Sequence, residues 1–375
     1  MFQGMVRREE SKTDRRSIMS ERKINFNAGP TALPLAVLEQ VQANVVNFEE
    51  NGLSLMEMSH RSPEFEEVIE RTKATLAHLY NLPDTHEVMF LQGGASLQFA
   101  MVPMNLGSGG SYLNTGTWST RAIAEARTVG QAEVPWSDEE NGFRRVPQQE
   151  ELDGLAITGP YLHYTTNNTI YGTQYQYIPQ SQTPLVADMS SDFISRPVDV
   201  SGHDLIYAGA QKNAGPSGVV VLIARKEVVH RFEGHETVPK IMRYATQAAK
   251  GSMYNTPNTF GIWVVGLVAQ WVTEQGGLEA MAAENERKAA ALYQAIDEHP
   301  LLEGHASEDS RSVMNVTFRA RTPAQEATLL SLATQQGIIG LRGHRSVGGL
   351  RASIYNAVPR ASVDALVEIL RGFKG

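Results

Sequence analysis

Residues 205–223 read LIYAGAQKNAGPSGVVVLI, and in this stretch a single lysine, Lys212, separates two short apolar runs. Apolar runs of this length, bounded by glycine or proline, are typical of buried strands. Small residues surround the lysine, so its side chain can be partly buried with room for a bulky group above it. Burial disfavours the charged form and lowers the pKa of an amine, which frees it to act as a nucleophile. A turn lysine that reaches solvent is the simpler interpretation, and this stretch alone does not exclude it.

Similar apolar runs recur along the chain and alternate with helical periodicity. Strands are expected at residues 88–91, 111–114, 132–135, 161–165, 185–189, 205–208 and 219–223. Ser62 and Pro63 supply an N-cap and a first-turn proline for a helix that continues to Leu79. Further helices are expected over 96–105, 259–274 and 278–298. Strands that alternate with helices predict an α/β fold with a mainly parallel sheet covered on both faces.

The pattern changes after Pro300. A strand at 313–318, a helix at 324–336, a strand at 350–355 and a helix at 362–373 predict a smaller α+β domain. We therefore divide the chain into a leader at 1–24, a large domain at 25–280 and a small C-terminal domain at 281–375. The boundary falls inside the long helix. The N-terminal strand segment 25–34 is expected to pack on the small domain.

Composition narrows the class of protein. The chain has 375 residues, with 33 Lys and Arg against 41 Asp and Glu, which gives a formal net charge of -8. That balance argues against nucleic acid or an anionic membrane as a partner. Cysteine is absent, which excludes disulfides, thiolate metal ligands and cysteine nucleophiles. No apolar run reaches the ~18 residues that span a bilayer, so a soluble, cytoplasmic protein is expected.

The first 24 residues are more basic than the rest, with seven Lys or Arg and four acids. They contain no apolar core of about 7–15 residues, so they are not a secretory signal. We expect a disordered leader or a start assigned too early, since Met5 and Met19 could each begin the chain. A targeting or partner-binding segment is the alternative.

Common nucleotide and metal motifs are absent. No G-x-x-x-x-G-K-[ST] occurs, and Tyr112 takes the place of the last glycine in a G-x-G-x-x-G pattern that begins at Gly107. His235-Glu236 does not continue to H-E-x-x-H, and the ten histidines show no ligand spacing, so no metal is expected. With these nucleotide and metal sites excluded, the remaining possibility is chemistry that depends on another kind of cofactor.

Three further features suit a lysine that bonds to pyridoxal phosphate. Asp188 follows the apolar run 185–187, where it either caps a helix or pairs with the cofactor's pyridine nitrogen. Residues 93–96 (GGAS) lie between a strand and a helix and can present N–H groups and a hydroxyl to a phosphate, although such turns are common. Trp118, expected at a turn, either stacks on a ring or packs in the core.

A basic segment lies near the C-terminus. Between Ile338 and Pro359 there is no acid, and Arg360 follows directly; the basic residues within the segment are Arg342, His344, Arg345 and Arg351. Guanidinium groups suit paired anions, a carboxylate at one end of a substrate and a phosphate or carboxylate at the other. A basic surface strand is the alternative.

In these features the chain resembles the phosphoserine aminotransferase family, class-V aminotransferases that depend on pyridoxal phosphate. The resemblance covers everything after the leader and is specific in order and spacing. It rests on FNAGP at 26–30, SHR at 59–61, GGAS at 93–96, NTIYG at 168–172, QKN at 211–213, NTP at 255–257, GHR at 343–345 and RASIYN at 351–356. It implies the aspartate-aminotransferase-like fold (fold type I), with a seven-stranded sheet in the large domain and a homodimer.

The resemblance also implies roles for individual residues. Lys212 would bond to the cofactor, Asp188 would pair with its ring nitrogen, Trp118 would stack on the ring and Thr169 would lie beside its phenolic oxygen. The phosphate would be held by Ala95, Ser96 and Gln211, joined by Asn255 and Thr256 of the second subunit. Substrate would be bound by His344, Arg345 and Arg351, joined by His60 and Arg61 of the second subunit. Ala28 departs from relatives that carry a serine there, so a hydroxyl contact with substrate is in doubt.

The implied reaction is a reversible ping-pong transfer from L-glutamate to 3-phosphohydroxypyruvate, giving O-phospho-L-serine and 2-oxoglutarate in serine biosynthesis. Some relatives also act in pyridoxine synthesis, and the sequence leaves open whether this chain does. The alternatives are an aminotransferase of the alanine–glyoxylate type and a catalytically silent binding protein. The His-Arg pairs argue against the first and the retained Lys212 and Asp188 against the second, while a cysteine desulfurase is excluded by the lack of Cys.

Overall fold

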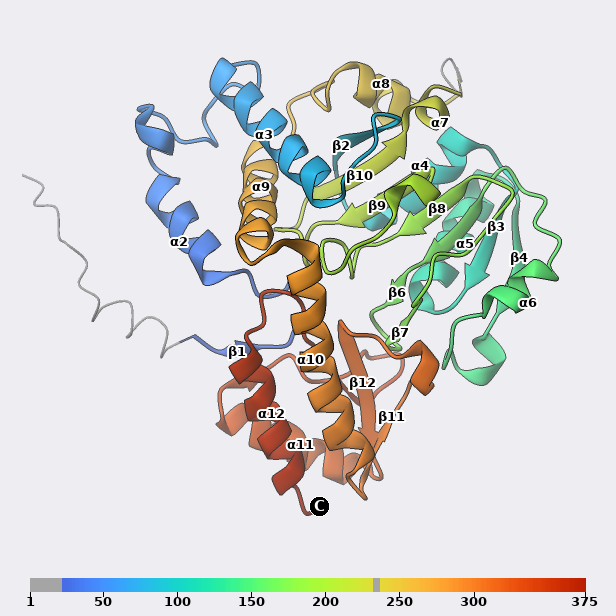
Figure 1. Cartoon of the computed structure of the whole chain (residues 1–375), viewed down its shortest axis with the longest axis vertical. Coiled ribbons are helices and arrows are strands. Elements are labelled where there is room, and N and C mark those ends of the chain that lie inside the picture. Colours follow the sequence, from blue (N-terminus) through green and yellow to red (C-terminus); the bar gives the residue numbers. More distant parts are fainter. Residues whose placement is uncertain (1–21, 232–236) are drawn as a thin grey trace, which may run out of the picture.

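A seven-stranded sheet forms the centre of the chain (Figure 1). The computed structural model describes residues 22–231 and 237–375, so most of the expected leader lies outside the described residues. In spatial order the strands are β2 (His86–Gln92), β10 (Val219–Arg225), β9 (Leu205–Gly209), β8 (Leu185–Asp188), β5 (Leu162–Thr165), β3 (Gly110–Asn114) and β4 (Ala132–Ser137). Every strand predicted for the large domain is therefore present and belongs to one sheet.

The sheet is mainly parallel, as predicted. β9, β8, β5, β3 and β4 run in the same direction, whereas β10 is antiparallel to both of its neighbours, β2 and β9. The turn that contains Lys212 connects β9 to β10. Parallel strands bring their carboxyl ends to one edge of a sheet, and in this chain Lys212 lies just beyond that edge.

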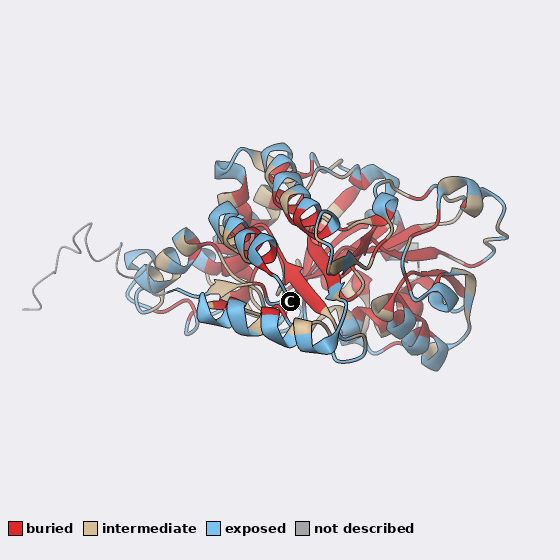
Figure 2. Cartoon of the chain, turned by 90° about the horizontal axis from the view of Figure 1, so that it is seen from below, coloured by how far each residue is buried: buried red, intermediate tan, exposed pale blue. Residues whose placement is uncertain are grey.

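Helices cover both faces of the sheet. α3 (Pro63–Leu79) and α9 (Thr259–Glu274) pack on one face, and α4 (Ala95–Leu106) and α5 (Thr117–Val129) pack on the other. The predicted N-cap is confirmed, because the Ser62 side chain accepts a hydrogen bond from the Phe65 N–H. Figure 2 shows the strands buried between outer helices whose far sides are exposed. Strands covered on both faces are apolar along their whole length, which explains why the sequence revealed them.

Several shorter elements complete the large part of the chain. They are α2 (Leu35–Asn44), α6 (Gln149–Asp153), α7 (Lys226–Arg231), α8 (Tyr244–Ala249), the paired strands β6 (Asn167–Asn168) and β7 (Thr173–Gln174), and 3-10 turns at 48–50, 139–141, 200–202 and 240–242. The sequence analysis named none of them. β6 and β7 form a small hairpin next to the carboxyl edge of the main sheet. Thr169 lies in the loop of this hairpin.

The C-terminal part has its own sheet and core. Its elements are α10 (Gly277–Asp297), β11 (Leu302–Gly304), a 3-10 turn at 308–310, β12 (Asn315–Ala320), α11 (Pro323–Gln335), β13 (Ile338–Ile339), β14 (Leu350–Ser353) and α12 (Arg360–Gly372). β12 pairs antiparallel with β11 and β14, and a separate apolar cluster lies beneath them. β1 (Ile24–Asn25) pairs in parallel with β13, so the N-terminal strand lies against this part (Figure 1).

α10 runs unbroken through residue 280, so the boundary between 280 and 281 falls within one helix, as the sequence analysis expected. One predicted strand differs from the structure in its C-terminal bound. The expected strand at 350–355 ends at Ser353. Ile354 and Tyr355 follow β14, and their carbonyls accept hydrogen bonds from the buried Lys288 amine.

Candidate functional site

The site begins where three parallel strands end. Thr165 ends β5, Asp188 ends β8 and Gly209 ends β9, and Lys212 follows three residues later. Ligands of open α/β sheets bind at this edge, because the loops that follow the strands leave a crevice there. The position of Lys212 therefore matches the usual place of a binding site in this architecture.

Lys212 is a buried amine at this edge, with 8% of its surface exposed. Its Nζ donates a hydrogen bond to Thr169 Oγ1 at 2.6 Å. Burial lowers the Lys212 pKa to about 8, an effect that the Asp188 carboxylate opposes and the Arg351 charge reinforces. Thr31 fixes the backbone, since its Oγ1 donates to the Lys212 carbonyl at 2.6 Å. A substantial neutral fraction near physiological pH makes this amine a competent nucleophile.

Asp188 supplies a buried acid beside the lysine, with 4% of its surface exposed. Its Oδ1 accepts hydrogen bonds from Ser190 N at 2.9 Å and Ser190 Oγ at 2.6 Å. Ser190 Oγ in turn accepts from the Gly209 N–H at 3.1 Å, which ties the acid to β9. Burial raises the Asp188 pKa, and the Lys212 charge opposes that shift. A buried carboxylate of this kind is poised to pair with a cationic nitrogen.

Trp118 provides a flat apolar surface next to the lysine. The sequence analysis expected it at a turn, but it lies in the first turn of α5, after Gly116. The Lys212 Nζ lies 5.4 Å from the centroid of its ring. The buried Trp118 Nε1 has no hydrogen-bond partner among the described residues. An indole so placed suits stacking on a planar ligand.

The first turn of α4 offers backbone donors. Gly93, with φ of 94°, turns the chain from β2 toward the helix, and Gly94 at the N-cap provides no side-chain cap. The N–H groups of Ala95 and Ser96 belong to this first turn, which lacks intrahelical partners and favours anions. Gln211 precedes Lys212, and its side-chain amide lies next to Gly209, the last residue of β9.

Cationic groups reach the site from the C-terminal part of the chain. Arg351 on β14 is 9% exposed, and its guanidinium donates to the Thr169 carbonyl at 3.2 Å. Its Nε is buried and has no partner among the described residues. Burial first, and then the charges of Arg351, Arg121 and Arg345, lower the pKa of His344. These groups therefore form one positive cluster.

The structure revises the membership of the basic segment. Arg360 is exposed, and its Nε bonds to Asp364 at 3.0 Å on α12, so it does not belong to the positive cluster. Arg342 is also exposed. Arg121, which the sequence analysis did not identify, joins the cluster from α5. Its spacing from Trp118 on one helix was the only signal that could have found it.

Four predicted residues lie apart from this site within one chain. Arg61, Asn255 and Thr256 are exposed, and His60 has a buried Nε2 without a partner among the described residues. The Thr256 carbonyl accepts from Gln92 Nε2 at 2.7 Å. No hydrogen bond or ion pair in the described ranges links these four residues to Lys212, Asp188 or Arg351.

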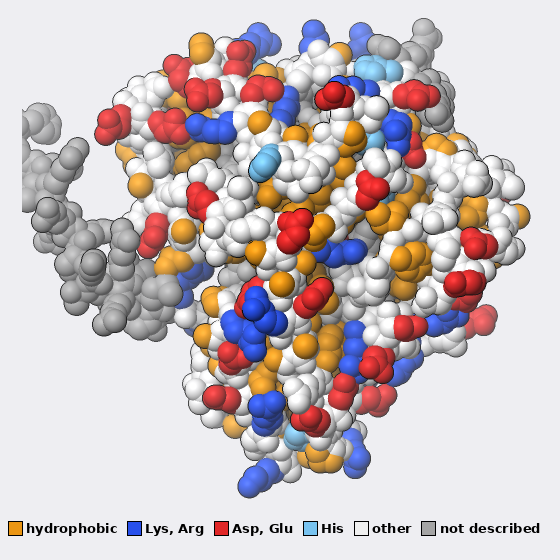
Figure 3. Space-filling view, in the orientation of Figure 1, with side chains coloured by type: hydrophobic (Ala, Val, Ile, Leu, Met, Phe, Trp, Pro, Cys, Tyr) orange, Lys and Arg blue, Asp and Glu red, His pale blue; other side chains and the backbone are white. Residues whose placement is uncertain are grey.

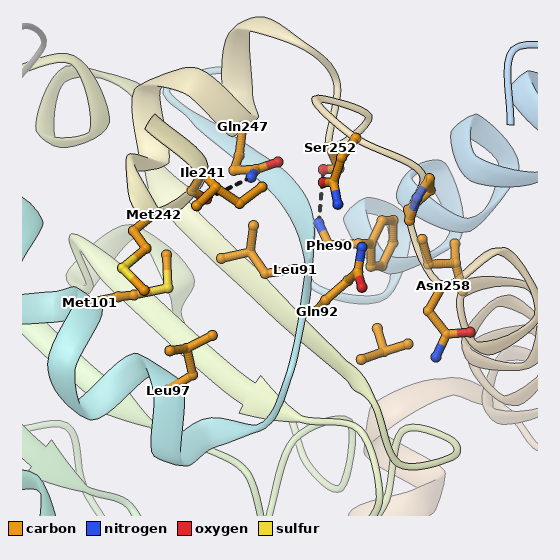
Figure 4. Close-up of a pocket in the computed structure, with 14 residues that line it drawn as sticks. Phe90, Leu91, Gln92, Leu97, Met101, Ile241, Met242, Gln247, Ser252 and Asn258 are labelled. Carbon is orange, nitrogen blue, oxygen red and sulfur yellow. Dashed lines mark hydrogen bonds between the residues drawn. The ribbon is translucent and has the colours of Figure 1, made fainter. Parts of the chain in front are cut away.

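Asn255 lines an apolar cavity of about 170 Å³, shown in Figure 4. Leu97 of α4, Ile241 and Met242 lie around it, together with Phe90 and Leu91 of β2. Leu97 and Ile241 are among the exposed large apolar residues of the chain. An opening of this composition beside the α4 turn suits contact with another apolar surface.

The described residues contain neither a metal-binding cluster nor a membrane-spanning helix. No group of His, Asp and Glu among residues 22–231 and 237–375 has the arrangement of a metal site. Within the same ranges no helix is both long and apolar enough to pass through a bilayer. On the face shown in Figure 3, acidic and basic side chains are interspersed.

Comparisons with known proteins agree with this geometry. The class-V aminotransferase family model matches residues 24–366. A phosphoserine aminotransferase of Desulfotalea psychrophila is 50% identical over 358 residues, which are 95% of this chain and 98% of that protein. The solved phosphoserine aminotransferase of Bacillus circulans subsp. alkalophilus is 45% identical, with a TM-score of 0.91 over 94% of this chain and 98% of that one.

Two further structures extend the comparison. A phosphoserine aminotransferase from Trichomonas vaginalis, solved with PLP bound, is 36% identical with a TM-score of 0.87, over 93% of this chain and 100% of that one. An aspartate aminotransferase from Thermus thermophilus, at 18% identity and a TM-score of 0.75 over 92% of this chain and 97% of that one, shares the fold. The predicted fold class is confirmed.

Proposed function

The chain belongs to the phosphoserine aminotransferase family of class-V aminotransferases, and from that premise we propose that its site transfers the amino group of L-glutamate to 3-phosphohydroxypyruvate. The products are O-phospho-L-serine and 2-oxoglutarate, and the transfer is reversible. The observation that carries the proposal is the buried Lys212 amine, which donates a hydrogen bond to Thr169 Oγ1, while the carbonyl of the same threonine accepts one from Arg351.

Pyridoxal phosphate fits the residues at this edge of the sheet. The Trp118 ring offers a stacking surface beside Lys212, and the buried Asp188 offers a carboxylate for a pyridinium nitrogen. Ala95 and Ser96 in the first turn of α4, together with Gln211, would hold the phosphate. When bound, the cofactor supplies an aldehyde that bonds to amines and a ring that accepts electrons.

Three residues would act directly on the cofactor. Lys212 would bond to it and, once free, would carry a proton to and from the Cα of the amino acid. Thr169 orients the lysine through the 2.6 Å hydrogen bond, and it would lie beside the cofactor's phenolic oxygen. Asp188 is fixed by Ser190, and it would keep the ring nitrogen protonated.

The positive cluster binds the two anionic ends of the substrates. Arg351 is buried and contacts the same Thr169 as the lysine does, so we assign it to the α-carboxylate next to the reacting carbon. His344 and Arg345 lie farther out and are assigned to the distal phosphate or carboxylate. Charge-assisted hydrogen bonds of this kind are about twice as strong as neutral ones.

We further propose that two copies of the chain share each site. His60 and Arg61 would complete the substrate pocket of the partner, and Asn255 and Thr256 would complete its phosphate site. Three of these residues are exposed and unlinked to the chain's own Lys212, and the exposed apolar residues around the cavity in Figure 4 lie beside Asn255. Ala28 supplies no hydroxyl to the substrate.

The remaining expectations stay proposals. We place the enzyme in the cytoplasm and in serine biosynthesis, without a membrane or nucleic acid as partner. The large domain is taken as 25–280 and the small domain as 281–375. Activity in pyridoxine synthesis is a second possible function, and the same assay tests it when the phosphorylated substrate of that pathway replaces 3-phosphohydroxypyruvate.

The test is an assay of the full chain loaded with pyridoxal phosphate. With L-glutamate and 3-phosphohydroxypyruvate, phosphoserine and 2-oxoglutarate should form in equal amounts, and Lys212→Ala should form neither. L-alanine with glyoxylate serves as the competing pair. Transfer between that pair without transfer to 3-phosphohydroxypyruvate would refute the proposal.

A further inference from the structure

Arg121 belongs to the positive cluster, but neither end of the substrate has been assigned to it. It follows Trp118 by three residues in α5, so the two side chains share a helix face. Its guanidinium carbon lies 4.9 Å from the centroid of the Trp118 ring, within the range of a cation–π contact. The same ring lies 5.4 Å from the Lys212 amine. Arg121 is therefore one side chain away from the reacting centre.

The charge of Arg121 is unpaired in the part of the chain that the structure describes. No acid within residues 22–231 and 237–375 forms an ion pair with it. Other arginines of this chain do form such pairs, for example Arg145 with Glu151 at 2.6 Å and Arg311 with Asp297 at 2.6 Å. An exposed guanidinium that lies against an indole and faces no acid keeps its N–H edges available for an anion.

The contact with Trp118 places Arg121 at the site, and its charge acts on one of the residues that we assign to the distal anion. It contributes to the lowered pKa of His344, together with the charges of Arg351 and Arg345. His344 and Arg345 come from the C-terminal part of the chain, whereas Arg121 comes from α5 of the large part. An anion that bound to Arg121 and His344 together would connect the two parts.

We propose that Arg121 is a specificity-determining residue that binds the distal phosphate of the substrate and favours it over a distal carboxylate. The inference rests on the proposed function and adds a residue to it. A phosphate monoester carries a charge of about -1.5 to -2 near neutral pH and has three acceptor oxygens, while a carboxylate carries about -1. An additional guanidinium therefore stabilises the bound phosphate more than the bound carboxylate, and its planar edge can donate two parallel hydrogen bonds.

The experiment compares two ligands on three variants of the holoenzyme. O-phospho-L-serine and L-glutamate are titrated separately, and the dissociation constant is read from the change in the visible spectrum of the bound cofactor. The variants are Arg121→Gln, Arg121→Lys and, as the matched control, Arg127→Gln, which removes an exposed charge from the last turn of the same helix. The kcat/KM for 3-phosphohydroxypyruvate and for 2-oxoglutarate is measured in parallel.

Arg121→Gln should raise the dissociation constant of O-phospho-L-serine about tenfold, the usual effect of losing a charge-assisted contact. The dissociation constant of L-glutamate should rise about twofold or less. Arg121→Lys should retain part of the preference, and Arg127→Gln should resemble wild type in both titrations. Equal weakening of both ligands, or no change in either, would overturn the inference. If wild type itself bound neither ligand, the proposed function would fail before the role of Arg121 was tested.

Discussion

Thr169 Oγ1 accepts a 2.6 Å hydrogen bond from Lys212 Nζ, which joins the β6–β7 hairpin to the turn between β9 and β10. The carbonyl of the same threonine accepts a 3.2 Å bond from Arg351 on β14. One residue thus connects the reactive amine of the large part with the buried guanidinium of the C-terminal part. In the proposed reaction, the covalent chemistry and the binding of the carboxylate would therefore lie side by side.

Replacing Lys212 should remove turnover without unfolding the chain. Lys212→Ala takes away the nucleophile and the proton carrier together, so steady-state phosphoserine formation should fall to background. Lys226→Ala, on the exposed side of α7, is the control for loss of an amine. Circular dichroism should match wild type for both variants. Sustained transamination by Lys212→Ala would mean that another group forms the covalent bond.

The lowered pKa of Lys212 predicts how uptake of the cofactor depends on pH. Only the neutral amine attacks the aldehyde, and its fraction grows as pH rises through about 8. The rate constant for covalent uptake by the apoprotein should therefore rise up to about pH 8 and then level off. Asp188→Asn removes a charge that raises this pKa, so the midpoint should move to lower pH. The measurement is stopped-flow absorbance across a pH series, and an unmoved or raised midpoint in Asp188→Asn would contradict the assignment.

Arg351 should serve both half-reactions, because glutamate and phosphoserine share the α-carboxylate. Arg351→Ala should lower kcat/KM for each substrate about tenfold or more, the size of a lost charge-assisted contact of about 1.5–3 kcal/mol. Arg345→Ala should weaken mainly the binding of the distal phosphate or carboxylate. Arg360→Ala is the control, since Arg360 pairs with Asp364 on the surface. If Arg351→Ala lowered kcat/KM for only one of the two amino acids, Arg351 could not be the residue that binds the α-carboxylate.

The central sheet was predictable because its strands are buried on both faces. β9 and β10 are apolar along nearly their full length, so no register or partner had to be known to recognise them. Helix α9 was likewise predicted with the bounds that the structure shows, 259–274, because it is apolar nearly all round. In these segments the local pattern and the tertiary environment agree.

The parts that the sequence did not reveal depend on contacts between distant residues. β6 and β7 consist of polar residues that are buried, and Asn167 is satisfied by Asn315, 148 positions away, at 2.8 Å. Thr31 holds the Lys212 carbonyl from 181 positions away. Neither pairing leaves a periodic pattern. Arg121 was missed for a related reason, since its significance comes from the effect of its charge on His344, which belongs to another part of the chain.

A buried lysine away from the site should make the free energy of unfolding depend on pH. Lys288 on α10 is fully buried, and its Nζ lies within hydrogen-bond distance of the carbonyls of Ile354 at 2.9 Å, Tyr355 at 2.8 Å and Val358 at 3.2 Å. Burial lowers its pKa from 10.5 to about 7. Between those values the unfolded chain binds more protons than the native chain, so the contribution of Lys288 to stability rises with pH.

The measurement compares wild type with Lys288→Met by urea unfolding over that pH range. The free energy of unfolding of wild type minus that of the variant should increase as pH rises from about 7 to about 10, with a slope of at most ~1.4 kcal/mol per pH unit. Subtracting the variant cancels the buried tyrosines, which titrate in both proteins. Lys226→Met, which removes an exposed lysine, is the control. A flat or falling difference for Lys288→Met would show that the native amine keeps an ordinary affinity for its proton.

The sharing of sites between subunits can be tested by mixing two inactive variants. Lys212→Ala disables the site of its own chain, whereas Arg61→Ala should disable the site of the partner. Each homodimer then carries a lesion at both of its sites. In a mixed dimer, two-fold symmetry places both lesions in one site and leaves the other intact.

Random re-pairing of equal amounts makes about half of the dimers mixed, and each mixed dimer has one intact site of two, so activity should recover to about a quarter of wild type. Subunit exchange is verified independently with two differently sized tags, and phosphoserine formation is followed as the mixture equilibrates. Lys212→Ala mixed with Arg351→Ala is the control, because both residues act in their own chain and every site then keeps one lesion. Full exchange without recovery would mean that Arg61 acts in its own subunit or not at all, and the shared site would have to be abandoned.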